Sequence, residues 1–188
     1  MQPERTSAAK LTYDDFLLFP EDGRRHELID GEHYVTPSPS IRHQRISQRL
    51  TVALGKFLED HRLGEVFCAP LDVILSGVDV IEPDLLYVAA GAPVDLSGTH
   101  VRGAPTLVAE IVSPGTRKTD EQTKRRLYDR AGAREYWVVD PELDVVKIYR
   151  RAIDGGFPRA AELSREAGDD LVTPLLPGFA LSLETLFG

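Results

Sequence analysis

The run from Thr106 to Val112 is almost wholly apolar beyond its first residue, and a single acid, Glu110, interrupts it. A short apolar run of this kind predicts a buried central strand in a sheet that is covered on both faces. Such a sheet needs other layers packed against it, which favours an α/β domain. Burial of a carboxylate within this strand is costly unless the carboxylate meets a partner or a cation. Glu110 is therefore the first candidate for a functional residue.

An N-terminal hairpin is expected around Asp30-Gly31, a dipeptide suited to the positive backbone angles of a two-residue turn. The flanking strands should run over Arg25–Ile29 and Glu32–Thr36. Before the hairpin, Thr12 is expected to cap a short helix that reaches Leu18.

Two longer helices are also expected. Ser38-Pro39 should cap and open a helix that runs to about His61, because its apolar residues recur on one face at helical spacing. Thr119 or Asp120 should cap the second helix, and Gly132 should end it. The remaining strands are expected within residues 65–75, 78–88, 106–112, 134–139 and 145–149, and a last short helix near residues 182–186.

Helices and hairpins both interrupt this order of strands, so the central sheet should be mixed. The predicted fold class is α/β, a single domain with a mixed central sheet flanked by helices, plus the N-terminal hairpin. Residues 1–10 are polar and non-periodic and are expected to form a flexible leader, with the domain covering residues 11–188. No apolar stretch approaches the ~20 residues that cross a bilayer. The start of the chain also lacks a signal-peptide pattern, so a cytoplasmic protein without a membrane partner is expected.

The charge of the chain restricts how it could bind nucleic acid. A formal net charge of -8 argues against binding by the whole surface, but not against a local basic patch. Residues 117–134 contain seven basic and three acidic residues, and Arg42, Arg45 and Arg49 form a basic row along the first long helix. A solvated helix face explains these residues almost as well as phosphate binding does. The candidates for nucleic-acid contacts are Arg42, His43, Arg45, Lys118 and Arg125.

The single cysteine, Cys68, excludes an internal disulfide framework and a zinc site with several cysteines. It is expected to be a buried, inert thiol.

Asp84 is a second acid in apolar surroundings, because it follows Pro83 and precedes the apolar run Leu85–Val88. Asp84 and Glu110 can meet only if their strands are neighbours, and together they could offer oxygen ligands to a hard cation such as Mg²⁺. Glu27 in the hairpin could supply a third oxygen. The alternative is structural: Glu110 pairs with an arginine, and Asp84 only caps the end of a strand.

These acids also carry a resemblance. Asp84 preceded by proline and Glu110 followed by Ile111-Val112 resemble the metal-binding half of the PD-(D/E)XK nuclease signature. More narrowly, the chain resembles the Uma-two family of restriction-endonuclease-like proteins, through motifs that run in one order from about Tyr13 to Phe187. These motifs are Glu27-Leu28-Ile29-Asp30-Gly31-Glu32, Pro39-x-x-x-His43, Glu82-Pro83-Asp84-Leu85-Leu86, Glu110-Ile111-Val112-Ser113-Pro114, Lys124-x-x-x-Tyr128, Gly132-x-x-Glu135-Tyr136-Trp137-Val138-Val139-Asp140-Pro141 and Pro174-Leu175-Leu176-Pro177-Gly178.

The resemblance implies a restriction-endonuclease-like fold and an Mg²⁺-dependent endonuclease that hydrolyses phosphodiester bonds of DNA, with Mn²⁺ as a substitute. It implies that Asp84 and Glu110 hold the metal and that Glu27 helps to hold it or to align water. The lysine usual two residues after the second acid is replaced by Val112. The resemblance implies that Lys124, from the following helix, takes its place. The alternative is a solvated Lys124 that pairs with Asp120.

Two other functions remain open from the sequence. Val112 at the usual lysine position also suits a nucleic-acid-binding module that keeps the nuclease fold without turnover. A protein unrelated to nucleic acid, with purely structural acids, is the third hypothesis. A homodimer is expected, since nucleases that cut both strands often pair two sites. The sequence leaves the choice between duplex DNA, single strands and RNA undecided.

Overall fold

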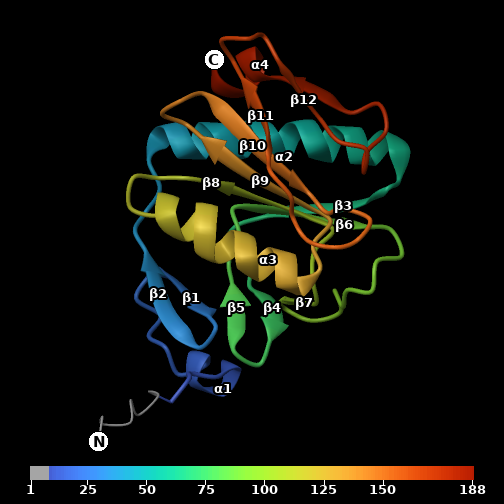
Figure 1. Cartoon of the computed structure of the whole chain (residues 1–188). Coiled ribbons are helices and arrows are strands. Elements are labelled where there is room, and N and C mark those ends of the chain that lie inside the picture. Colours follow the sequence, from blue (N-terminus) through green and yellow to red (C-terminus); the bar gives the residue numbers. More distant parts are fainter. Residues whose placement is uncertain (1–8) are drawn as a thin grey trace, which may run out of the picture.

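The computed structural model describes residues 9–188, so most of the leader expected at residues 1–10 lies outside the described residues. Figure 1 shows the arrangement of the elements. In chain order they are α1 (Tyr13–Phe16), β1 (Arg25–Ile29), β2 (Glu32–Thr36), α2 (Ile41–His61), β3 (Gly64–Cys68), β4 (Val73–Ser76), β5 (Asp79–Ile81), β6 (Leu85–Ala89), β7 (Val101–Arg102), β8 (Leu107–Ile111), η1 (Thr119–Lys124), α3 (Arg125–Ala131), β9 (Glu135–Asp140), β10 (Val145–Arg150), β11 (Ala161–Ser164), β12 (Asp170–Val172), β13 (Ala180–Ser182) and α4 (Leu183–Phe187).

The central sheet has six strands in the order β11-β10-β9-β8-β6-β3. Strands β8 and β9 are parallel, whereas the other neighbours in this sheet are antiparallel. The mixed central sheet and the α/β class predicted from the sequence are therefore confirmed. Every residue of β8 is buried, as its apolar character predicts.

The two faces of the central sheet are covered differently (Figure 1). The long helix α2 packs on one face together with the C-terminal segment, and their apolar side chains form one core with alternate residues of the sheet. Helix α3 lies on the other face, where the second core also includes residues of the hairpin, β4 and β5. Because side chains alternate along a strand, each residue of β8 faces either α2 or α3. The face on which a residue lies decides which helix its side chain can contact.

The hairpin has the predicted bounds, and its turn residues Asp30 and Gly31 have positive φ values of 54° and 74°. Helix α2 also ends where expected, but its cap was predicted wrongly. Ser40, not Ser38, is the N-cap, because the Ser40 hydroxyl accepts the N–H of His43 at 3.2 Å. Pro39 therefore precedes the helix instead of opening it.

The sequence missed a second sheet, which has the order β2-β1-β5-β4-β7. The runs predicted as continuous strands over 65–75 and 78–88 are each divided, and β4 and β5 join the hairpin. Pro70 and Pro83 lie at the two breaks, where a residue without an N–H cannot continue a ladder. Cys68, the last residue of the edge strand β3, is exposed, so its expected burial was wrong.

The helix expected from Thr119 begins as a π-helix, η1, and continues as α3 until Gly132, which has a φ of 97°. The helix and its glycine stop are thus confirmed, whereas its wide first turn was not anticipated. Among the described residues, no helix combines the length and the apolar character that a bilayer crossing needs.

Candidate active site

Asp84 directly precedes β6, and Glu110 lies within β8, the neighbour of β6 in the central sheet. Strands β6 and β8 pair antiparallel, with Leu85 opposite Ala109. Extending this register by one residue sets Asp84 opposite Glu110. The two acids, distant in sequence, are therefore brought together by the central sheet.

The direction of the Glu110 side chain follows from its strand. Ala109 and Ile111 belong to the core under α2, so Glu110 points to the opposite face. There its Oε1 accepts a hydrogen bond from the Tyr128 hydroxyl at 2.6 Å and one from the Lys124 ammonium at 3.0 Å. Glu110 is thus held by two side chains from the helical segment, and within residues 9–188 it forms no ion pair with an arginine.

Lys124 is buried, with 4 % of its side chain exposed, so the solvated alternative is wrong. Its ammonium donates to Oε1 of Glu27 at 2.8 Å and to Glu110, and Asp120 lies 3.8 Å away. The backbone N–H of Glu82 donates to the same Glu27 oxygen. Lys124 therefore connects the hairpin to the central sheet.

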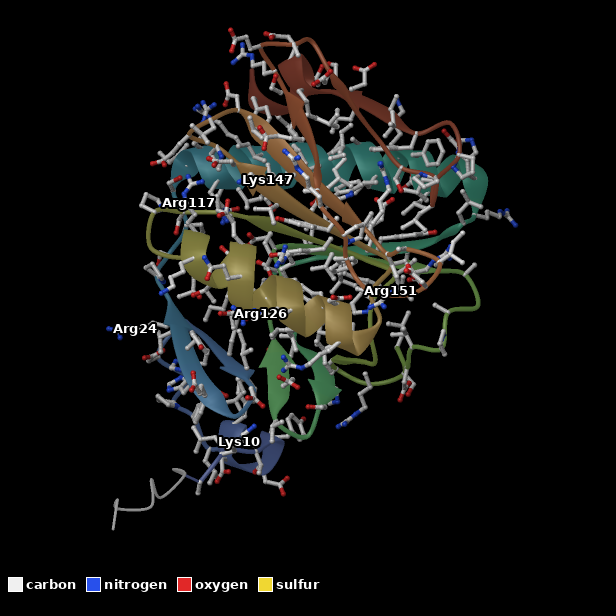
Figure 2. All side chains as sticks on the ribbon, viewed as in Figure 1. Lys10, Arg24, Arg117, Arg126, Lys147 and Arg151 are labelled. Carbon is white, nitrogen blue, oxygen red and sulfur yellow. The ribbon has the colours of Figure 1, made fainter. Side chains whose placement is uncertain are left out.

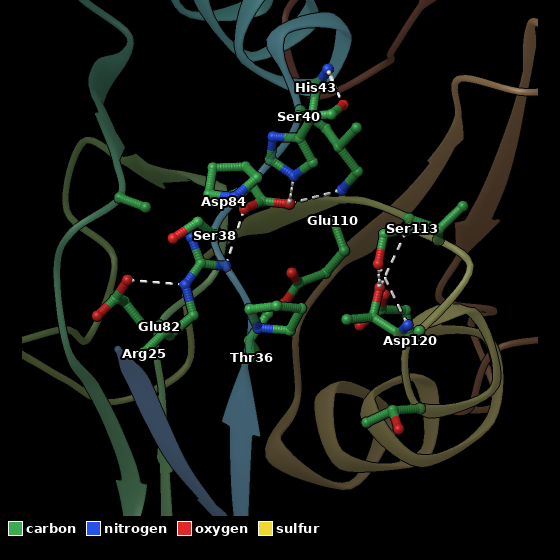
Figure 3. Close-up of a pocket in the computed structure, with 18 of the residues that line it drawn as sticks. Arg25, Thr36, Ser38, Ser40, His43, Glu82, Asp84, Glu110, Ser113 and Asp120 are labelled. Carbon is green, nitrogen blue, oxygen red and sulfur yellow. Dashed lines mark hydrogen bonds and ion pairs between the residues drawn. The ribbon is translucent and has the colours of Figure 1, made fainter. Parts of the chain in front are cut away.

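Asp84 is held from three sides (Figure 3). Its Oδ1 accepts from the Arg25 guanidinium at 2.9 Å, while its Oδ2 lies 3.1 Å from Nε2 of His43 and accepts the N–H of Ile111 at 2.8 Å. Arg25 also contacts Glu82, with its Nε 2.8 Å from a carboxylate oxygen. Both oxygens of Asp84 are therefore occupied by protein groups.

The two acids have opposite electrostatic surroundings. Burial alone would raise the pKa of Asp84, but the hydrogen bond and charge of His43, the charge of Arg25 and the Ile111 N–H lower it to about 2. Burial raises the pKa of Glu110 to about 8, and the nearby carboxylates add to this rise against the effect of Lys124. Paired carboxyls whose environments separate their pKa values are typical of catalytic sites.

Carboxyl groups outnumber basic groups around Lys124. Glu27, Glu110 and Asp120 surround this one ammonium, and burial also raises the pKa of Asp120. The same carboxylates raise the pKa of Lys124 despite its burial, so it remains a cation. A further cation would be favoured electrostatically at this place.

A pocket of about 980 Å³ opens beside these residues. Glu27, Asp84, Glu110 and Lys124 all line it, together with the segment that leads into α2 and the 113–116 loop. The acids are therefore buried at the base of a cleft and not within a closed core.

The donor chemistry of this cleft fits a hard divalent cation, although residues 9–188 contain no ready group of three or more His, Cys, Asp or Glu side chains able to hold a metal. Both oxygens of Asp84 are engaged, as is Oε1 of Glu110. Oε2 of Glu110 accepts no hydrogen bond from the described residues. One carboxyl oxygen thus remains open beside a cluster of acidic side chains.

The candidates for nucleic-acid contacts lie in different surroundings. His43 is buried in the site, and its Nδ1 has no hydrogen-bond partner in the described part of the chain. Arg42 is held by Asp144 and by the carbonyl of Pro141. Arg45 and Lys118 are exposed on the surface, whereas the Arg125 guanidinium lies over the Tyr149 ring at 5.3 Å.

Much of the basic charge counted over residues 117–134 is neutralised by acids elsewhere in the fold. Arg117 pairs with Asp140 and Arg130 pairs with Asp79. Figure 2 shows Arg117 and Arg126 on the side of the molecule that carries α3, and Arg24 extending outward beside the hairpin of β1 and β2. The basic patch is weaker than its sequence count suggests.

The sequence reasoning missed Arg25 and Glu82 as members of the site. Glu82 stands directly before Pro83-Asp84, a motif that the sequence did single out, and so could have been found. Arg25 has no local signal, because only the meeting of the two sheets brings the hairpin to Asp84.

Comparisons with known proteins identify the family of the chain and its fold. A family model described as "Uma2: Putative restriction endonuclease" matches residues 13–184. An uncharacterized protein of Synechocystis sp., slr1290, is 28% identical over 153 residues, covering 79% of this chain and 78% of its own. A crystal structure from Anabaena variabilis, titled a "putative nuclease belonging to DUF820", has a TM-score of 0.78 and 22% identity. That likeness covers 94% of this chain and 97% of the Anabaena chain, so nearly the whole fold is shared.

Proposed function

The chain belongs to the Uma2 family, whose model carries the description "Putative restriction endonuclease". We propose that it is a nuclease that hydrolyses DNA phosphodiester bonds with the help of Mg²⁺. The observation that carries the proposal is the meeting of Asp84, Glu110 and Lys124 at the base of one cleft. Carboxylates from adjacent strands beside a lysine suit metal-assisted hydrolysis, and their burial has no evident packing benefit.

Asp84 and Glu110 would hold Mg²⁺, or Mn²⁺ in its place, and Glu27 would add acidic charge beside them. When bound, a divalent cation polarises the scissile phosphate and lowers the pKa of a water molecule. His43 and the Ile111 N–H keep the Asp84 carboxylate ionised and fix its orientation. These contacts maintain a ligand that needs no deprotonation at neutral pH.

Lys124 would stabilise negative charge that develops on the phosphate or orient the attacking water. Its ammonium reaches Glu110 from the helical segment, which makes a lysine two residues after Glu110 unnecessary. Val112, at that position, packs instead in the core that contains Leu127 and Tyr128. The substitution at the usual lysine position is therefore compatible with catalysis.

Addition and removal of metal tests this function directly. We expect the purified protein to cut supercoiled plasmid in Mg²⁺ or Mn²⁺ and to lose this activity in excess EDTA, because the phosphate would then lack its counter-charge. Gel assays on plasmid, single-stranded DNA and RNA would identify the preferred target. Cleavage that continues undiminished in EDTA would contradict the proposal.

Phosphate contacts are assigned to exposed basic residues, with Arg45 and Lys118 the strongest candidates because neither forms an ion pair within residues 9–188. Changing both to alanine should weaken duplex binding. It should also reduce the magnitude of the slope of log K, where K is the binding constant, against log salt concentration by about 1.8, because each phosphate contact contributes about 0.9 to this slope. Fluorescence anisotropy at several salt concentrations measures this slope. Lys56→Ala with Arg62→Ala, two exposed basic residues toward the far end of α2, is the matched control. An equal change of slope in the control would remove the assignment of Arg45 and Lys118.

A catalytically silent DNA-binding module is the second candidate function. Its support is the occupation of both Asp84 oxygens by Arg25, His43 and the Ile111 N–H. DNA binding that is independent of metal, with no cleavage of any substrate, would favour it. Light scattering at several concentrations would test the expected homodimer independently of either function.

A further inference from the structure

Arg25 occupies one of the two oxygens that the proposed function assigns to metal binding. Its guanidinium donates to Oδ1 of Asp84 at 2.9 Å, and its Nε lies 2.8 Å from Glu82. Figure 3 shows Arg25 between these two carboxylates. Arg25 is 17 % exposed at its side chain and lines the pocket, so its charge lies at the edge of the cleft.

A guanidinium and a divalent cation cannot occupy the same carboxylate oxygen at once. Oδ2 of Asp84 is already bound by the Ile111 N–H, which the β8 backbone fixes in place, and it faces His43. Oδ1 is therefore the oxygen that can be released, because its partner is a side chain at the end of β1. Arg25 would have to withdraw from Asp84 before a metal could bind there.

Glu82 gives Arg25 a second attachment. The guanidinium carries five N–H donors in a fixed plane. The contact between its terminal nitrogen and Asp84 can therefore break while Nε keeps its contact with Glu82. The freed nitrogens would then remain at the rim of the pocket. A guanidinium is the side chain best suited to bind a phosphate through two parallel hydrogen bonds.

We propose that Arg25 is an exchangeable counter-ion of Asp84 which gives way to the metal and then binds a phosphate of the nucleic acid. This inference rests on the proposed metal-dependent function and extends it. It couples metal binding to substrate binding, since Arg25 is free to contact phosphate only after a cation has replaced it on Asp84. It also explains why the described residues hold no ready metal site although the acids are present.

The first test is isothermal titration with Mn²⁺ alone, without DNA. Arg25→Met should bind Mn²⁺ about tenfold more tightly than the unchanged protein, because a competing cation has been removed from the ligand. Arg25→Lys separates competition from simple charge: it keeps the positive charge but cannot span Glu82 and Asp84 as a planar fork does. Arg25→Lys should also bind Mn²⁺ more tightly than the unchanged protein. If Arg25→Met fails to fold, the Mn²⁺ affinity of Arg25→Lys alone tests whether Arg25 competes with the metal.

Arg24→Met is the matched control. Arg24 is the neighbouring residue and lines the same pocket, but 68% of its side chain is exposed and its acidic contact is Asp22, at 3.7 Å. Loss of its charge should leave the Mn²⁺ affinity within about twofold. Equal Mn²⁺ affinities for the unchanged protein and both Arg25 variants would overturn this inference alone. Absence of Mn²⁺ binding in all four proteins would instead contradict the proposed function on which it rests.

The second test measures binding to a phosphorothioate DNA duplex, which resists cleavage, with and without Mn²⁺. Arg25→Met should weaken binding about tenfold in Mn²⁺ and less than about twofold in EDTA, because Arg25 reaches phosphate only when it has left Asp84. An equal loss of affinity under the two conditions would overturn the exchange. No loss under either condition would also overturn it, since Arg25 would then make no phosphate contact.

Discussion

Glu110→Gln should lower the rate of Mg²⁺-dependent DNA cleavage about a thousandfold while leaving the protein folded. In the unchanged protein, Tyr128 and Lys124 donate hydrogen bonds to Oε1 of Glu110. Glutamine has nearly the same shape, and its carbonyl oxygen can accept the same two hydrogen bonds. What the variant loses is the ability to ionise when a cation binds, and with it the open carboxylate oxygen Oε2 beside the cleft. Initial rates of plasmid cleavage in Mg²⁺ measure the effect.

The matched control for this variant is Glu59→Gln, the same chemical change at an exposed position of α2. It should cut DNA at the rate of the unchanged protein. Cleavage by Glu110→Gln within about tenfold of the unchanged protein would remove Glu110 from the catalytic machinery.

The stability of the same variant should depend on pH in a definite direction. Burial raises the pKa of Glu110 from 4.5 to about 8, so between these values the folded chain binds a proton that the unfolded chain has lost. The contribution of Glu110 to the free energy of unfolding therefore falls as the pH rises through this window. Glutamine does not titrate, so the free energy of unfolding of Glu110→Gln does not fall for this reason. Its stability relative to the unchanged protein should therefore improve from pH 5 to pH 8. Urea unfolding at the two pH values measures the difference, and a relative decline would contradict the assigned direction.

Lys124→Met should destabilise the fold by about 3–5 kcal/mol, because it leaves buried carboxylates without their common cation. Glu27 and Glu110 would both lose a hydrogen bond from the ammonium, and Asp120 would lose its nearest positive charge. Methionine fills similar space, so the expected loss is electrostatic and not a cavity effect. Urea unfolding monitored by circular dichroism gives the free energy, and DNA cleavage should be lost as well.

Lys56→Met, an exposed change on α2, should alter stability by no more than about 0.5 kcal/mol. If the acids bind a divalent cation, Mg²⁺ should restore more stability to Lys124→Met than it adds to the unchanged protein. A Lys124→Met protein as stable as the unchanged one would show that Lys124 does not neutralise the cluster.

Local patterns were sufficient to predict the parts of the fold that depend on neighbouring residues. Asp30-Gly31 specified the hairpin because its turn needs two positive φ angles. Gly132 specified a helix end because the residue there also adopts a positive φ angle. The apolar run containing Glu110 predicted the buried β8. Ser38 was the wrong cap because Ser40 offers the same hydroxyl two residues later, and sequence alone does not separate them.

The second sheet and the surroundings of Asp84 depend on contacts that no local pattern encodes. The parallel neighbours β4 and β7 are separated by a long stretch of chain, and β1 meets β5 far along the sequence. The approach of Arg25 to Asp84 follows from this pairing of distant strands. The sequence could suggest that Asp84 and Glu110 meet, since each is an acid in apolar surroundings, but it could not show that an arginine already holds one of them.

The π-helical turn over Thr119–Lys124 limits where insertions and deletions can be tolerated in this chain. A π-helix fits an additional residue into a turn, so removal of one residue there would restore ordinary α-helical winding. Each residue of an α-helix advances the side-chain direction by about 100°, so Lys124 and Asp120 could no longer keep their present orientations together. One lost codon in this turn would therefore turn Lys124 away from Glu27 or Asp120 away from Lys124, so length variation is not expected there.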